Sequence, residues 1–283
     1  MSKTGLIMEG GAMRGIFTAG VIDVLMENGI TFDGAIGVSA GAAFGCNYKS
    51  KQIGRVLSYN LRFCNDPRFA GLQSLVRTGD LFGAEFCYKT IPYELDYFDK
   101  ETYDSNPMEF YVVCTDVDTG KPVYHRCDIV NDETLDWIRA SSSMPMVSRI
   151  VRIGRQRLLD GGIVDSIPVR YFESIGYDRN VAILTRPKDY VKEPYKMMPF
   201  LRASMRRMPM VLKALRRRHL MYNETTAYIR SREEAGELFV IRPPEELDIN
   251  RVEHDPDKIL ATYRVGVETA REALPALKAY LGQ

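Results

Sequence analysis

Three short glycine-containing motifs hold residues that could do chemistry, and the sharpest is Gly37-Val-Ser-Ala-Gly41. A G-x-S-x-G pattern between a strand and a helix forms a nucleophile elbow: a strained turn exposes the serine hydroxyl, and the glycines let the backbone pass without clashes. Amides at the helix start beside Ser39 would stabilise an oxyanion that develops on an attacked carbonyl group. A serine that merely caps a helix is the competing interpretation.

The second motif, Glu9-Gly-Gly-Ala-Met-Arg-Gly15, also follows an expected strand and leaves two interpretations open. A dinucleotide-binding loop needs glycine at positions 10, 12 and 15, but position 12 is Ala12, although Asp33 has the spacing of a ribose ligand. An oxyanion loop needs amides of Gly11 and its neighbours that face one point, with Arg14 as an anchor of the loop.

The third motif, Asp160-Gly-Gly162, supplies a carboxylate that could serve as the base that a nucleophilic serine needs. The chain has three histidines, His125, His219 and His254, and their polar or hairpin surroundings predict surface positions. An aspartate with an ordinary pKa near 4 is a weak base, so geometry and oxyanion amides should matter more than basicity. A triad that uses His254 stays open as an alternative.

The elements that must position these motifs begin with an alternating order. Apolar and glycine patterns predict a strand at 5–8, a helix at 13–28, a strand at 35–38 and a helix at 39–48. Such an order implies parallel strands with right-handed crossovers and a ligand site at the carboxyl ends of the strands.

The rest of the chain continues the α/β pattern around an irregular insertion. Residues 52–108 lack a sustained period and are expected to form helices and loops of a cap. The further expected elements are a strand pair at 110–115 and 123–125, a helix at 132–140, strands at 157–159, 180–185 and 238–241, and a helix at 256–281 that bends near Pro275.

Composition places the chain among ordinary globular proteins. It has 283 residues, with 38 Lys and Arg against 37 Asp and Glu, which excludes a chain that coats nucleic acid along its length. Five widely spaced cysteines suggest neither a zinc knuckle nor a disulfide framework, so a reduced cytoplasmic setting and metal-independent chemistry are expected. The N-terminus has no stretch typical of a signal peptide, and no uncharged run has the length of a membrane span.

The near-neutral charge conceals a basic segment, which we define as residues 194–223. It contains eight Lys and Arg and no acidic residue, and the remainder carries 30 basic against 37 acidic residues. Interspersed methionines and leucines make the pattern typical of helices that lie on anionic bilayers. A solvated pair of basic helices that packs through its Met and Leu face and breaks at Pro209 is the competing interpretation.

Together with Ala140-Ser-Ser-Ser-Met-Pro145, the three motifs resemble in type and order the patatin-like phospholipases, a family of lipid acyl hydrolases. The resemblance covers most of residues 4–185 and implies a three-layer α/β/α fold with a mainly parallel central sheet and helical insertions. It also implies a Ser–Asp dyad without histidine and without a cofactor. The roles that it implies are Ser39 as nucleophile, Asp160 as base, Gly10, Gly11, Ala12 and Arg14 in the oxyanion loop, Gly37 and Gly41 in the elbow, and Gly161 and Gly162 as supports.

We therefore expect one domain over 1–283, with core motifs in 4–185, the basic segment, and a C-terminal strand and helix over 237–283. The expected activity is hydrolysis of lipid esters, either in the cytoplasm or at a membrane that the basic segment contacts. The alternatives are an α/β-hydrolase esterase with His254 in a triad, and a non-catalytic protein that binds a membrane or a nucleotide. The family loop carries three successive glycines where this chain has Ala12, which bears on the role of that amide.

Overall fold

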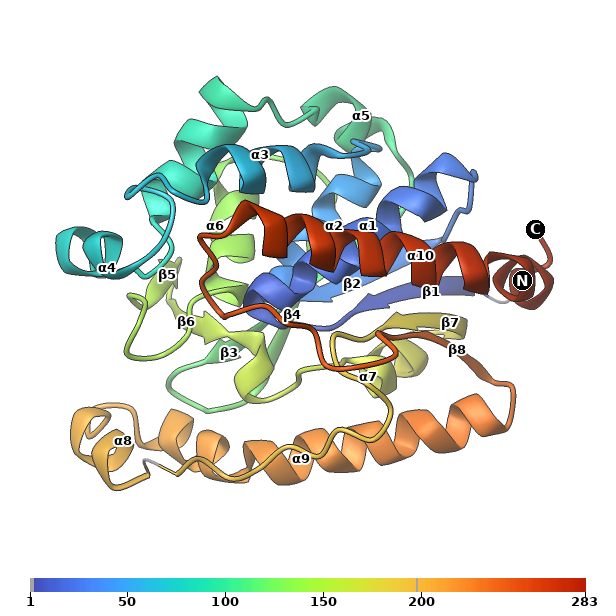
Figure 1. Ribbon diagram of the computed structural model, residues 1–283. Coiled ribbons are helices and arrows are strands. Elements are labelled where there is room, and N and C mark those ends of the chain that lie inside the picture. The colour runs from blue at the N-terminus through green and yellow to red at the C-terminus, as the bar shows by residue number, and fades with distance from the viewer. Residues whose placement is uncertain (1–2, 197) are drawn as a thin grey trace.

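An eight-stranded sheet forms the centre of the molecule (Figure 1). The computed structural model describes residues 3–196 and 198–283, apart from the side chains of residues 198–200. Residues 1 and 2 of the N-terminal stretch and Met197 of the basic segment lie outside the described residues. The strands are β1 (Lys3–Met8), β2 (Gly34–Val38), β3 (Glu109–Asp116), β4 (Pro122–Arg126), β5 (Val151–Ile153), β6 (Gln156–Asp160), β7 (Tyr177–Ile183) and β8 (Leu238–Ile241).

The strand order is β5-β6-β3-β2-β1-β7-β8, and β4 pairs with β3. Strands β3, β2, β1, β7 and β8 are parallel to one another, whereas β4, β5 and β6 form antiparallel pairs. Because the parallel strands end at one edge, the segments that follow β1 and β2 lie together there, as the βαβα order predicts.

Helices cover both faces of the sheet. The α-helices are α1 (Gly15–Glu27), α2 (Ala40–Lys49), α3 (Arg55–Phe63), α4 (Leu72–Thr78), α5 (Lys100–Ser105), α6 (Asp132–Ser141), α7 (Val169–Ser174), α8 (Met198–Ser204), α9 (Pro209–Glu234) and α10 (Pro256–Leu281). Successive side chains of a strand point to opposite faces. Leu6 and Met8 accordingly pack with α1, α2, α6 and α10, and Ile7 packs with α7 and α9. The predicted three-layer α/β/α fold is confirmed.

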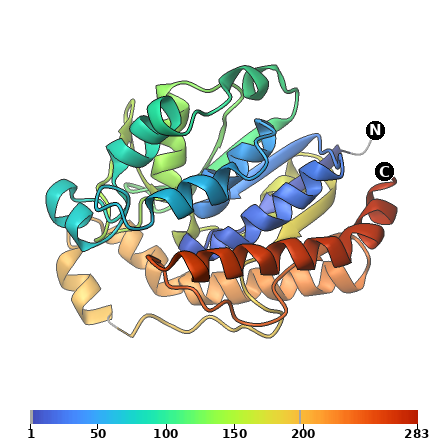
Figure 2. The ribbon, with the colours of Figure 1, turned by 45° about the horizontal axis from the view of Figure 1, so that its top comes forward.

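Close contact between α1 and α10 joins the beginning of the chain to its end (Figure 2). A Cβ atom at Gly20 would lie 2.3 Å from the carbonyl oxygen of Tyr263, and one at Gly266 would lie 2.2 Å from that of Phe17. Glycine at both positions therefore lets the two helix backbones touch. Helix α10 continues through Pro275, and its last turns bend away from its main axis in Figure 2.

The predicted cap consists of α3, α4, the π-helix η2 (Phe86–Leu95) and α5. Its apolar side chains, among them Phe63, Phe69 and Phe86, pack with Ile16 of α1 and Phe44 of α2 in one core cluster. The insertion is thus packed against α1 and α2, the helices that follow β1 and β2.

Several elements differ from those expected. The first helix begins as a 3-10 turn, η1 (Ala12–Arg14), and β7 begins and ends earlier than the expected strand at 180–185. The short elements β5 and α7 were not expected. The basic segment forms α8 and α9, with Pro209 as the first residue of α9, because proline is tolerated in the first turn of a helix.

Candidate active site

Ser39 lies on the turn between β2 and α2, as an elbow requires. Its φ is +55° and its ψ is −122°, a conformation that L-residues rarely adopt. The turn is tight, because a Cβ atom at Gly37 would lie 2.4 Å from the carbonyl oxygen of Gly41 and one at Gly41 would lie 2.3 Å from that of Met8. The Ser39 hydroxyl does not cap α2, so the competing interpretation as a plain helix cap fails.

Ser141 holds the elbow from a distant part of the chain. The Ser39 amide donates to the Ser141 hydroxyl oxygen at 2.9 Å, and the Ser141 hydroxyl donates to the carbonyl oxygen of Val113 at 2.6 Å. In the sequence, Ser141 is only one member of the small-residue segment at 140–145 and has no role of its own. Its hydrogen bonds connect β2, β3 and α6, and they give the segment a positioning role.

Asp160 is the last residue of β6, and it is buried beside Ser39. Its backbone is fixed by Ser143 and Thr115: the Asp160 amide donates to the Ser143 carbonyl oxygen at 2.8 Å, and the Thr115 hydroxyl donates to the Asp160 carbonyl oxygen at 2.7 Å. Its carboxylate accepts the Gly162 amide at 2.7 Å, and interaction with the Ser39 side chain lowers the pKa of the carboxyl group. The structure thus places the two residues of the predicted dyad beside each other.

Burial raises the pKa of Asp160 to about 6. The Ser39 side chain, the charge of Arg218 and the Gly162 amide each oppose that rise in pKa without cancelling it. The sequence-based expectation of an ordinary pKa near 4 is therefore wrong for this side chain. A carboxylate with a pKa close to neutrality is a better proton acceptor for a serine hydroxyl.

The glycine loop between β1 and η1 lies against the elbow. A Cβ atom at Gly10 would be 3.0 Å from the Ser39 Cβ atom and 2.8 Å from the carbonyl oxygen of Val38. Ala12 has a φ of +50°, a value that glycine adopts more readily, and so occupies the position of the missing third glycine. Among the described residues, the amides of Gly10, Gly11 and Ala12 have no protein acceptor. These three amides are thus free to donate from a loop that lies against the elbow at Gly10.

Glu9 and Arg14 flank this loop. Glu9 is buried, and its carboxylate accepts the Thr185 amide at 2.6 Å and the Tyr222 hydroxyl at 2.7 Å. These bonds connect the loop to the segment that follows β7 and to α9. The pKa of Arg14 is lowered by burial and by Arg186, and its Nε atom has no hydrogen-bond partner within residues 3–196 and 198–283.

An apolar cavity of about 620 Å³ opens beside Ser39. Its lining combines the elbow, the cap and the basic segment, and includes Met13, Phe44, Tyr59, Phe82, Ile138, Met144, Tyr195 and Leu215. This volume lies within the usual range of small-molecule sites, and such a lining suits a hydrocarbon chain.

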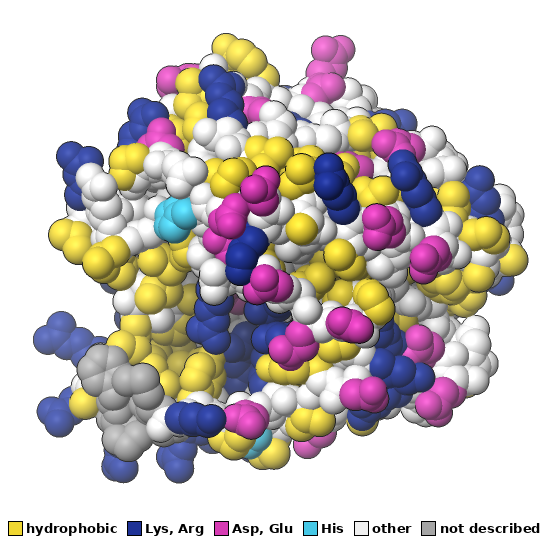
Figure 3. Space-filling view, viewed as in Figure 1, with side chains coloured by type: hydrophobic (Ala, Val, Ile, Leu, Met, Phe, Trp, Pro, Cys, Tyr) yellow, Lys and Arg dark blue, Asp and Glu magenta, His cyan; other side chains and the backbone are white. Residues whose placement is uncertain are grey.

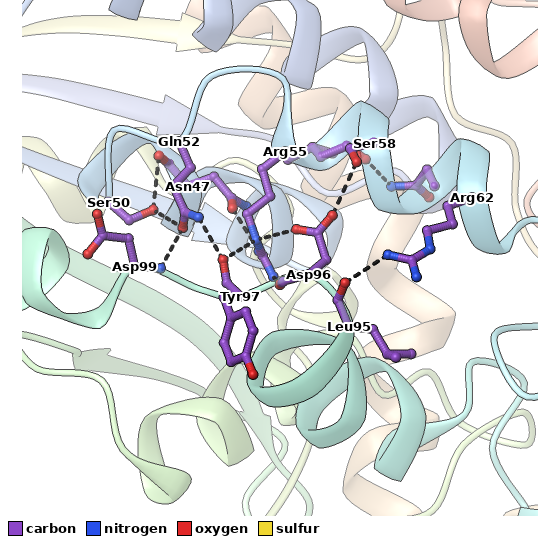
Figure 4. A network of polar contacts seen from close by, with 12 residues as sticks. Asn47, Ser50, Gln52, Arg55, Ser58, Arg62, Leu95, Asp96, Tyr97 and Asp99 are labelled. Atoms are coloured by element: carbon purple, nitrogen blue, oxygen red, sulfur yellow. Dashed lines mark hydrogen bonds and ion pairs between the residues drawn. The ribbon is translucent and has the colours of Figure 1, made fainter.

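The wall that the cap contributes is held by Arg55 of α3 (Figure 4). Its guanidinium forms an ion pair with the Asp96 carboxylate at 2.9 Å and donates to the Asn47 side-chain oxygen at 2.9 Å. It also donates to the carbonyl oxygen of Tyr97 at 3.2 Å. Arg55 therefore attaches the end of η2 to α2 and α3 at the boundary of the cavity.

No histidine lines the cavity in the described part of the chain. The His254 Nδ1 atom lies 2.6 Å from the carbonyl oxygen of Cys64, and the His125 ring stacks on Trp137 with ring centres 4.0 Å apart. His254 is exposed as predicted, whereas His125 is half-buried. Among the described residues, the alternative triad therefore has no histidine beside Ser39 that could serve as its base.

Comparison with known proteins decides the family. The family model for patatin-like phospholipases matches residues 6–173. The chain belongs to the patatin-like phospholipase family. This confirms the resemblance and the predicted class of enzyme, a lipid acyl hydrolase. A second family model, a domain of unknown function called DUF6363, matches residues 208–282.

The relatives differ in how much of their length the chain spans. It is 30% identical over 265 residues to the uncharacterized protein YjjU of Escherichia coli, covering 87% of this chain and 70% of YjjU. It is 29% identical over 189 residues to lysophospholipase nte1 of Aspergillus terreus, covering 62% of this chain and 11% of that protein. The crystal structure of VipD from Legionella pneumophila has a TM-score of 0.48 at 13% identity, covering 98% of this chain and 67% of VipD.

Two further observations bear on cofactors and membranes. Within the described residues, no group of three or more His, Cys, Asp or Glu side chains is placed to hold a metal ion. None of the described helices has both the length and the hydropathy of a membrane span.

Proposed function

We propose that this member of the patatin-like phospholipase family hydrolyses the ester bonds of phospholipids or lysophospholipids through an acyl-enzyme on Ser39, with Asp160 as the base. The observation that carries the proposal is the placement of a serine on a strained elbow beside a buried carboxylate, at the wall of a large apolar cavity. The name of the lysophospholipase relatives agrees with this substrate class.

In the first half-reaction, the Ser39 oxygen attacks the ester carbonyl carbon while its proton moves to Asp160. Amides of Gly10, Gly11 and Ala12 donate to the oxyanion that forms, and the helix start at α2 favours the same negative charge. Collapse breaks the bond to the alcohol, which takes the proton from Asp160 and leaves the acyl group on Ser39.

In the second half-reaction, Asp160 accepts a proton from water as the water oxygen attacks the acyl-enzyme. Collapse of this intermediate breaks the bond to Ser39, whose oxygen recovers the proton from Asp160. The fatty acid leaves from the apolar cavity, and the enzyme returns to its starting protonation state.

Paired substitutions test the proposal. Ser39→Ala and Asp160→Asn should each remove ester hydrolysis, by a factor of about 10³ or more, with the fold retained. His254→Ala is the matched control and should keep wild-type kcat/KM. Hydrolysis of a long-chain lysophospholipid, with circular dichroism as the measure of folding, gives the readout. Activity that survives in Asp160→Asn and is lost in His254→Ala would contradict the dyad and favour a triad.

The proposal includes contact between the basic segment and an anionic bilayer. Arg202, Arg206 and Arg207 are exposed in and after α8, whereas Met205 and Val211 are buried in a core cluster. Leu215 is buried as well, whereas Met210 and Leu220 are exposed, so both charge and apolar side chains are available for the contact. In both ribbon views α4 lies at the same end of the molecule as α8 (Figures 1 and 2), and it exposes Leu72 and Val76.

A further inference from the structure

Four cationic side chains from distant segments gather next to the glycine loop, and we define them as the basic recess: Arg14, Arg186, Lys192 and Arg218. All four are partly buried. Charge interactions connect Lys192 to each of the three arginines. Lys and Arg side chains are visible within the hollow above α9 in Figure 3.

The basic recess is poorly neutralised by protein carboxylates. Among the described residues, Arg186 is the only member that forms an ion pair, with the exposed Glu246 at 3.0 Å. Both Glu9 oxygens accept hydrogen bonds from neutral groups, the Thr185 amide and the Tyr222 hydroxyl. Burial and the charges of the three arginines together lower the pKa of Lys192 to about 7, while Glu9 opposes them. A buried excess of positive charge is costly unless an anion compensates it.

Several donors around the recess have no partner. The Nε atoms of Arg14 and Arg186 and the Thr185 hydroxyl are buried without a hydrogen bond in the part of the chain that the structure describes. Thr185 itself has no exposed surface. Buried polar groups in native proteins are nearly always hydrogen-bonded, so these three atoms indicate a ligand with several acceptor oxygens.

The basic recess adjoins both the dyad and the apolar cavity. The Arg218 Nε atom donates to the carbonyl oxygen of Gly162 at 2.5 Å, two residues from Asp160, and its Nη1 atom donates to the Tyr195 hydroxyl at 2.6 Å. Tyr195 lines the cavity. The Thr185 hydroxyl lies 2.7 Å from where a Cβ atom of Gly11 would be. An ester at Ser39 could thus extend toward the cavity on one side and the recess on the other.

We propose that the basic recess binds the phosphate group of the substrate while the acyl chain occupies the apolar cavity. Arginine forks and a lysine point charge suit phosphate oxygens. The assignment rests on the proposed function and specifies a glycerophospholipid or its lyso form over a neutral ester. Three of the four cations lie beyond residues 6–173, so the recess combines Arg14 of the segment that defines the family with side chains from the C-terminal part of this chain.

Binding of phosphate alone tests the site without ester chemistry. Inorganic phosphate and glycerol 3-phosphate are titrated calorimetrically into the Ser39→Ala variant, which cannot form an acyl-enzyme. Adding Lys192→Gln or Arg186→Gln should weaken binding of both anions by about tenfold or more, because each removes a charge-assisted hydrogen bond. The matched control is Lys213→Gln, an exposed cation of α9 outside the recess, which should keep the affinity. Lys192→Arg keeps the charge and should restore most of the binding.

The second arm compares two substrates with the same acyl chain, a lysophosphatidic acid and a monoacylglycerol. In the Lys192→Gln and Arg186→Gln variants, the ratio of kcat/KM for the phosphate ester to that for the neutral ester should fall about tenfold. Melting temperatures by circular dichroism show that each variant folds.

The outcomes separate the claims. The phosphate site is overturned if the Ser39→Ala variant does not bind phosphate. It is also overturned if adding Lys192→Gln or Arg186→Gln leaves the phosphate affinity unchanged. Phosphate binding that depends on Lys192 together with an unchanged substrate ratio overturns the headgroup assignment and leaves a site for free phosphate. If the wild-type chain hydrolyses neither ester, the proposed function fails. In that case, phosphate binding to the Ser39→Ala variant that disappears when Lys192→Gln is added would still support the basic recess.

Discussion

At the scale of single residues, the protonation of Asp160 sets the pH at which the proposed reaction can run. Its pKa is raised to about 6 by burial, so the carboxylate that accepts the Ser39 proton predominates only above that pH. For folding the sign is opposite: a carboxyl group whose pKa rises on folding stabilises the protein at low pH, and this contribution is lost as pH rises through about 6.

We therefore predict that kcat/KM falls about tenfold per pH unit below pH 6 and is level from about pH 7 to 8. Initial rates on a soluble short-chain ester, measured between pH 4.5 and 8, give the profile. Buffers in which circular dichroism shows the folded state define the usable range. An acid limb of the kcat/KM profile with its midpoint near pH 4 would contradict the raised pKa of Asp160.

Sequence alone predicted Ser39 and Asp160 because each lies in a short local motif with a chemical purpose. It could not predict Ser141 as the partner of the Ser39 amide or Arg218 as a neighbour of Asp160, since these contacts join residues far apart in the chain. The raised pKa was missed for a related reason: it depends on how fully the fold buries one carboxylate.

At the scale of elements, the attachment of the cap depends on the ion pair between Arg55 and Asp96. Their side chains are only 7% and 14% exposed. Removal of one partner from such a pair leaves a buried charge uncompensated, at a cost of several kcal/mol. The same pair borders the cavity, so its loss should loosen the cavity wall.

Asp96→Ala should lower the free energy of unfolding by roughly 3 kcal/mol. The matched control is Asp248→Ala, which removes the exposed partner of Lys258 and should cost less than about 1 kcal/mol. Urea unfolding followed by circular dichroism measures both. Equal, small losses in the two variants would show that the cap does not depend on this ion pair.

Elements with a strong local signal were predicted well. Buried apolar runs bounded by glycine indicated β1 and β2, helical spacing indicated α1, and an acidic first turn indicated α6. The three-residue strand β5 was missed because it exists only through pairing with β6. In the cap, tertiary packing determines short helices whose sequences lack a period.

At the scale of the whole molecule, the proposed bilayer contact falls at one end. Helix α8, which carries Arg202, lies at the same end as α4 (Figures 1 and 2). Helix α4 exposes Leu72 and Val76, and residues next to both helices line the cavity. An enzyme oriented in this way could take up a lipid directly from the surface that it contacts.

We predict that the protein pellets with vesicles that contain an anionic lipid and much less with neutral vesicles, at low salt. Arg206→Glu combined with Arg207→Glu should weaken this binding by about 2 kcal/mol or more, since each cation near an anionic surface contributes about 1 kcal/mol. Arg271→Glu, at an exposed position of α10, is the control and should bind like the wild type. No preference for anionic vesicles would remove the membrane contact.

The central claim, that Asp160 activates Ser39 as a nucleophile, is tested most directly by labelling with a fluorophosphonate probe and locating the label by mass spectrometry. We expect one phosphonylated residue, Ser39, with no label in Ser39→Ala and a rate lowered about a hundredfold or more in Asp160→Asn. A label on another residue, or labelling of Asp160→Asn at the wild-type rate, would contradict the account.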